Sequence, residues 1–89
     1  MAKILIPLAL QRLTEGKGKV EISAKNISEL IDSLELRFPG TKKLIAPENR
    51  VQQFINIYVN NKDIRFLQNE SSLIKDSDEI NIVLAVSGG

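Results

Sequence analysis

The sequence predicts an α+β domain in which one main helix covers one face of a five-stranded sheet. One segment, residues 27–38, has apolar residues at helical spacing. Around it lie short segments that are apolar or alternate apolar with polar residues, and turn-forming Gly, Pro, Asn and Asp separate them. Because a single helix covers only one sheet face, the other face is left to water or to a partner.

The composition narrows the classes of function. The chain has 89 residues, which suits one domain with one core, and its charged residues are interspersed, with 12 basic and 11 acidic side chains. A net charge of +1 gives no basic stripe for binding nucleic acid. Cysteine and histidine are absent, which argues against the usual zinc and iron–sulfur sites. No apolar run approaches the roughly 20 residues of a membrane span, so we expect a cytoplasmic protein that binds neither metal, nucleic acid nor membrane.

The first elements are predicted to form a β-hairpin. Residues 3–10 are nearly all apolar, which predicts a strand buried on both faces. A signal peptide is disfavoured, because polar residues end the run at once and no small-residue cleavage site follows. Gly16 and Gly18 provide the backbone freedom of a loop. Residues 19–24 then alternate charged and apolar side chains, which predicts the second strand.

The main helix is predicted from its spacing and its ends. The apolar residues that define its buried face are Ile27, Leu30, Ile31, Leu34 and Phe38. Asn26 suits the N-cap, and Glu29 stands at the position of a capping-box partner. Pro39 and Gly40 end the helix.

The second half of the chain is predicted to complete the sheet. Residues 41–52 have no clear period and are predicted as a loop with a short helical turn. Residues 53–59 alternate, which predicts a strand, and a polar turn at 60–63 leads into a short strand at 64–67. Residues 80–86 are apolar on both faces, which predicts a central strand.

This order of elements, ending in Ser87-Gly88-Gly89, resembles the ubiquitin-like β-grasp proteins. More specifically, the chain resembles the prokaryotic sulfur carrier proteins, which include the small subunit of molybdopterin synthase and the thiamine-pathway and cysteine-pathway carriers. The segment Phe54–Phe66 is most similar to the cysteine-pathway branch. The resemblance implies a five-stranded mixed sheet in a β-grasp domain of residues 1–86, followed by a flexible reactive tail of residues 87–89.

The resemblance also implies the chemistry of the tail. A ubiquitin-activating-type enzyme would adenylate the Gly89 carboxylate with ATP, and a sulfur donor would convert the acyl-adenylate to a thiocarboxylate. Activation is needed because a carboxylate is a poor electrophile. Gly88 and Gly89 lack Cβ atoms and could thread a narrow channel, while Ser87 either forms a hydrogen bond there or is a plain polar linker. The chain would be a co-substrate rather than an enzyme, with no catalytic residues and no bound cofactor.

Several readings of the function stay open at this level. The sequence of Phe54–Phe66 favours a cysteine-synthase-like acceptor enzyme that uses pyridoxal phosphate, with the large subunit of molybdopterin synthase as the next candidate. A protein modifier that forms an isopeptide bond through Gly89 is a second class. A noncovalent β-grasp module with incidental glycines is a third. Trimming of a longer precursor and the oligomeric state of the free protein are not determined by the sequence.

A docking surface is predicted on the uncovered sheet face. By strand parity this face carries Phe54, Tyr58 and Val83. Exposed aromatic residues often anchor interfaces, so we hypothesise that these three dock the activating enzyme. Equally, some of them could lie beneath the loop of residues 41–52. Arg65 is a candidate rim contact, with a solvated strand charge as the alternative.

Overall fold

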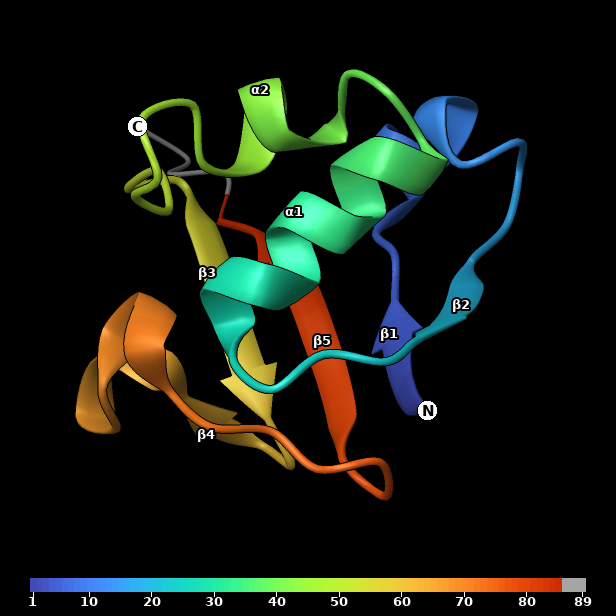
Figure 1. Ribbon diagram of the computed structural model, residues 1–89. Coiled ribbons are helices and arrows are strands. Elements are labelled where there is room, and N and C mark those ends of the chain that lie inside the picture. The colour runs from blue at the N-terminus through green and yellow to red at the C-terminus, as the bar shows by residue number, and fades with distance from the viewer. Residues whose placement is uncertain (86–89) are drawn as a thin grey trace.

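The computed structural model describes residues 1–85 and shows one mixed sheet with helices packed against one face (Figure 1). The strands are β1 (Ala2–Leu5), β2 (Lys19–Ile22), β3 (Ile55–Val59), β4 (Lys62–Asp63) and β5 (Glu79–Leu84), in the spatial order β2-β1-β5-β3-β4. The helices are α1 (Ile27–Arg37) and α2 (Thr41–Ile45), and three 3-10 helices are η1 (Leu8–Leu13), η2 (Ile64–Phe66) and η3 (Asn69–Ser71). No helix within residues 1–85 is long and apolar enough to span a membrane.

Strand β5 lies at the centre of the sheet, as the sequence predicted. It runs parallel to β1 and antiparallel to β3. Ile80 pairs with Ile4 of β1, and Ile82 pairs with Ile57 of β3, and all four side chains are buried. The prediction of a mixed five-stranded sheet is therefore confirmed, although β5 ends at Leu84 rather than at residue 86.

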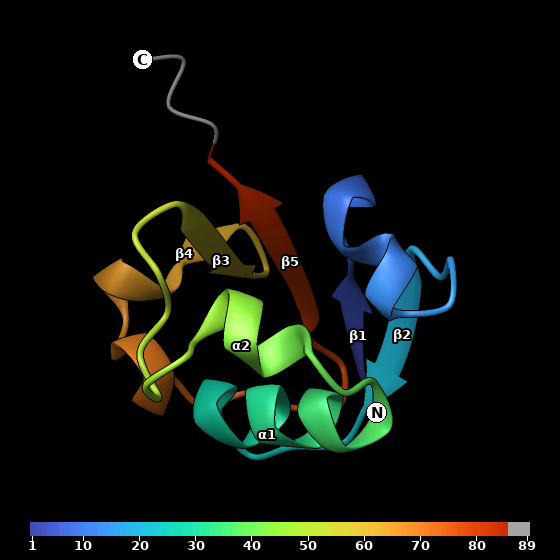
Figure 2. The same cartoon turned by 90° about the horizontal axis from the view of Figure 1, so that it is seen from above.

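Helix α1 covers the core face of the sheet with the residues that the sequence predicted. Leu30 and Leu34 are completely buried, and the Asn26 side chain accepts a hydrogen bond from the Glu29 N–H at 2.8 Å, which confirms the N-cap. After Arg37, the left-handed backbone of Gly40 (φ +102°) turns the chain into α2. Helices α1 and α2 lie on the same side of the sheet (Figure 2).

A carboxylate joins the two helices at this turn. The Glu35 side chain accepts hydrogen bonds from the N–H groups of Gly40 and Lys42, at 3.1 Å and 2.9 Å from Oε1. These groups belong to the first turn of α2, where backbone N–H groups have no partner within the helix. Thus α1 supplies the cap that α2 lacks.

The first strand is shorter than predicted and is not buried on both faces. Strand β1 ends at Leu5, and after Pro7 the chain enters η1. Proline has no N–H to donate to a ladder. Lys3 and Leu8 are exposed whereas Leu10 is buried, so the apolar run divides between a strand and a helical turn. Strand β2 does pair with β1 in the predicted antiparallel hairpin.

The short strand predicted at residues 64–67 is also wrong, because residues 64–66 form η2. The Asp63 side chain accepts a hydrogen bond from the Arg65 N–H at 2.8 Å and caps this turn. A local side-chain bond of this kind competes with the strand ladder. Strand β4 is consequently only two residues long, and the chain leaves the sheet edge at Ile64.

We expect Leu34→Ala to lower the free energy of unfolding by about 2–5 kcal/mol, because the substitution leaves a cavity beneath α1. Leu34 is 0% exposed, whereas Leu36 on the same helix is 85% exposed. Leu36→Ala is therefore the matched control, with an expected loss below about 0.5 kcal/mol. Urea denaturation measures both values, and equal losses would contradict this account of the core.

Candidate functional site

The sheet face opposite α1 carries the three residues predicted to form a docking surface. Asn56 pairs with Val83 and Tyr58 pairs with Asn81 in the β3–β5 ladder, and directly paired residues point to the same side of a sheet. Their neighbours along the strands, such as Ile57 and Ile82, point into the core. The observed register therefore agrees with the strand alternation that was predicted from the sequence.

We call Phe54, Tyr58 and Val83 the open-face patch. Phe54 lies just before β3 and is 44% exposed, while Tyr58 and Val83 are half-buried. The Phe54 carbonyl accepts a hydrogen bond from the Ala85 N–H at 2.7 Å. The patch therefore adjoins the last described residue, from which the chain continues toward its carboxyl end.

The predicted reactive residues Ser87, Gly88 and Gly89 lie outside the described residues. Their proposed roles are therefore argued from chemistry and family resemblance alone. Within residues 1–85, no group of three or more Asp or Glu side chains is placed to hold a metal ion.

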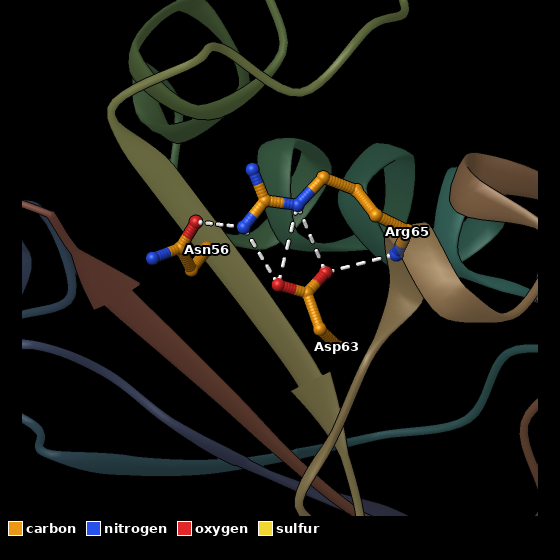
Figure 3. Close-up of polar contacts among 3 residues, drawn as sticks. All are labelled: Asn56, Asp63 and Arg65. Carbon is orange, nitrogen blue, oxygen red and sulfur yellow. Dashed lines mark hydrogen bonds and ion pairs between the residues drawn. The ribbon is translucent and has the colours of Figure 1, made fainter.

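Arg65 lies in η2 rather than on a strand, so the alternative of a solvated strand charge is wrong, and its role as a rim contact stays a prediction. Its Nη2 atom donates to Asn56 Oδ1 at 2.8 Å and to Asp63 Oδ2 at 2.7 Å, and its Nε atom donates to both Asp63 oxygens at 3.1 Å and 3.2 Å (Figure 3). The guanidinium is thus fixed by two side chains. The spacing of Asp63 and Arg65, two residues apart in a 3-10 turn, was the available sequence signal for the ion pair.

This ion pair keeps both partners charged. The hydrogen bond from Arg65 lowers the pKa of the Asp63 carboxyl below its ordinary value of 3.8, although burial opposes this shift. The same bond raises the pKa of Arg65. The Asp63 side chain is only 10% exposed, whereas that of Arg65 is 60% exposed. The pair therefore presents a guanidinium to solvent above a covered carboxylate.

Phe66 is an aromatic residue near the open-face patch, and it was not predicted from the sequence as a site residue. Its side chain is exposed, and with Tyr58 and Leu67 it lines an open groove of about 510 Å³ beside β4. The sequence predicted a strand at residues 64–67, so it gave no indication that Phe66 would project from the sheet in η2.

The chain matches the model of the ThiS family over residues 4–89. It belongs to the ThiS family. The sulfur carrier protein CysO of Mycobacterium tuberculosis is 34% identical to it over an alignment of 89 positions that covers 97% of this chain and 96% of that protein. The predicted resemblance to ubiquitin-like sulfur carriers, and among them to the cysteine-pathway branch, is therefore confirmed.

Solved structures support the fold assignment. The structure of a BexX/CysO complex from Amycolatopsis orientalis contains a chain that matches with a TM-score of 0.94 and 36% identity, with 100% of both chains covered. Small archaeal modifier protein 1 from Methanosarcina acetivorans matches with a TM-score of 0.83 and 30% identity over 99% of this chain and 95% of that one. The β-grasp prediction is confirmed.

The lowered pKa of Asp63 predicts how its contribution to stability depends on pH. A depressed folded-state pKa stabilises the protein above the unfolded pKa, and this stabilisation disappears as pH falls through the folded value. We expect Asp63→Asn to destabilise the protein more at about pH 7 than at about pH 2. Denaturation at the two pH values measures this difference.

Asp76→Asn is the control for this experiment, because Asp76 is 79% exposed and lies 3.7 Å from the amino-terminal nitrogen. Exposed ion pairs contribute little to stability, so its effect should be small at both pH values. A loss for Asp63→Asn that is the same at both pH values would contradict the assigned role of the ion pair.

Proposed function

We propose that this chain carries sulfur as a thiocarboxylate on Gly89 and delivers it for the biosynthesis of cysteine. The observation that carries the proposal is the match to CysO along nearly the whole chain, at 34% identity. The family model also extends through Gly89, so the glycines lie within the matched region. The β-grasp body and the sulfur-carrier family agree with this role.

The proposed chemistry places the bond changes on the terminal carboxylate. The Gly89 carboxylate oxygen attacks the α-phosphate of ATP on the adenylating enzyme, and pyrophosphate leaves. A sulfur nucleophile then attacks the acyl carbon, so that a C–S bond forms as the C–O bond to AMP breaks. ATP is bound by the adenylating enzyme, and pyridoxal phosphate by a cysteine-synthase-like acceptor, so the carrier itself needs neither cofactor.

The body of the carrier is proposed to hold the adenylating enzyme through the open-face patch. The hydrogen bond between Phe54 and Ala85 places this patch beside the point where the chain continues to the tail. An enzyme seated on the patch would therefore have the carboxyl end within reach. The Amycolatopsis relative was solved together with a second protein, BexX, which supports binding of a protein partner by this fold.

A protein modifier is the second candidate function. The likeness to small archaeal modifier protein 1, at 30% identity, favours it. In that role Gly89 would form an isopeptide bond with a lysine of a target, after the same adenylation step. Larger covalent species in cells would support it. The large subunit of molybdopterin synthase is the alternative acceptor if the acceptor is not a cysteine-synthase-like enzyme.

The thiocarboxylate is tested on the carboxyl-terminal peptide after incubation with the adenylating enzyme of the host, ATP and a sulfur donor. We expect the mass change of one oxygen replaced by sulfur, located on Gly89 by fragmentation. The peptide is required because oxidation of Met1 adds nearly the same mass to the intact chain. An unmodified carboxylate with a competent enzyme would contradict the proposal.

In the same assay, Gly89→Ala should lower the rate of activation about 100-fold, because a methyl group displaces the reacting carbon in a narrow channel. The free energy of unfolding should stay that of the unsubstituted protein. Ser87→Ala is the matched control, and its rate of activation should be closer to that of the unsubstituted protein. Unimpaired activation of the Gly89 variant would contradict the assigned role of this residue.

Phe54→Ala should raise the KM for the carrier in adenylation about fivefold to tenfold, since an aromatic anchor is removed from the interface. Leu36→Ala is the control, because Leu36 is an exposed apolar residue on α1, in the other layer. Enzyme kinetics with the carrier as the varied substrate measure both effects. Equal KM values for the two variants would argue against docking on this face.

A further inference from the structure

Arg65 is held beside β3, on the side away from β5, at the edge of the open-face patch (Figure 3). The residue that anchors it, Asn56, stands two positions from Phe54 and two from Tyr58 along β3. Asn56 also pairs directly with Val83 of β5. Alternate strand residues and paired residues share a face, so the guanidinium is bound at one side of the face that carries Tyr58 and Val83.

The hydrogen bonds of Arg65 leave one nitrogen available in a defined direction. Nε and Nη2 donate to Asp63 and Asn56, whereas Nη1 makes no hydrogen bond to any residue in 1–85. Figure 3 shows Nη1 pointing away from both acceptors. Because a guanidinium is planar, fixing Nε and Nη2 also fixes Nη1.

The charged groups of this half of the open face balance, since the exposed Glu79 shares its face of β5 with Asn81 and Val83, and Lys62 lines the groove beside Tyr58. The Asp63 carboxylate cancels the Arg65 charge at 2.7 Å. The paired β3 and β5 positions on this half are uncharged: Asn56, Tyr58, Asn81 and Val83. On the β1–β2 half, Lys3 pairs with Glu21 and with Glu79 of β5, and Leu5 pairs with Lys19. A partner that covers the β3–β5 half therefore meets a surface whose opposite charges balance, with one oriented pair of N–H donors on Arg65.

We propose that Nη1 of Arg65 donates to an uncharged main-chain carbonyl of the adenylating enzyme, in a segment whose apolar side chains cover the open-face patch. A partner carboxylate would bring a second negative charge close to Asp63 in a surface that loses water on binding. A carbonyl accepts the hydrogen bond without that charge. Without an acceptor, the covered Nη1 would lose its hydrogen bonds to water. This inference rests on the proposed function, because it takes the adenylating enzyme as the partner.

Asp63 and Asn56 act here as positioning residues. They hold the guanidinium before the partner arrives, so less side-chain freedom is lost on binding. Replacement of Asp63 by Asn distinguishes a carbonyl acceptor from a carboxylate acceptor, because the two predict opposite changes in affinity. It loosens the guanidinium and uncovers its positive charge, which weakens binding to a carbonyl but strengthens binding to a carboxylate.

The test measures the KM of the full chain with the adenylating enzyme of the host for Asp63→Asn, Arg65→Lys and the control Arg12→Lys. Arg12 is an exposed residue of η1. We expect the first two variants to raise KM about tenfold and the control to leave it unchanged. The KM of the unsubstituted carrier should change little between low and physiological salt, because the opposite charges of the surface balance.

A KM that falls or stays unchanged in Asp63→Asn, or that rises steeply with salt, would overturn the proposal in favour of an acidic acceptor. Arg65→Lys keeps the charge but not the planar fork, and the exposed Arg65 position tolerates it, so it serves if Asp63→Asn fails to fold. A KM for Arg65→Lys equal to that of the unsubstituted carrier would also overturn the proposal.

A second measurement needs no partner. Separate Nη1 and Nη2 signals of Arg65 in ¹⁵N NMR spectra of the free protein, lost in Asp63→Asn, would support a held guanidinium, and averaged signals would overturn it. Failure of the unsubstituted carrier to be adenylated would instead overturn the proposed function and this inference with it. A carrier that is adenylated normally but is insensitive at Asp63 and Arg65 overturns this inference alone.

Discussion

The packing of α1 against the central strand β5 is the interaction on which the rest of the structure depends. Ile80 and Ile82 are buried between β1 and β3 and belong to the same core cluster as Leu30 and Leu34 of α1. Because β5 runs parallel to β1, the first and last strands meet only when the intervening chain has crossed the sheet. With a single main helix available, that crossing covers one face and leaves the other open.

The open face and the course of β5 together define what the body can contribute to sulfur transfer. The hydrogen bond from Ala85 to Phe54 places the end of the described chain next to the open-face patch. Recognition is assigned to the rigid sheet, while the proposed chemistry is assigned to Gly89. In the proposed mechanism a chain without cysteine or histidine takes part in sulfur chemistry because its partners supply the catalytic groups.

One local hydrogen bond changes the character of the open face. By capping η2, the Asp63 side chain ends β4 after two residues and directs Arg65 toward Asn56 beside β3. The same carboxylate then neutralises the guanidinium and, with Asn56, orients it. A continued strand would have placed Arg65 along the sheet edge. The short turn instead lets the guanidinium reach Asn56 at the edge of the open-face patch.

The sequence by itself determined the elements whose signals are local or periodic. The helical spacing from Ile27 predicted α1, the apolar faces of residues 80–86 predicted a central strand, and alternation predicted that Tyr58 and Val83 share a face. The diglycine at residues 88–89 indicated the sulfur-carrier family. Only the tertiary structure decided that η1 replaces the end of the first strand and that Arg65 contacts Asn56. Periodicity records which face of a segment is buried, but an apolar run suits a strand or a turn equally well, and contacts between distant residues depend on the path of the whole chain.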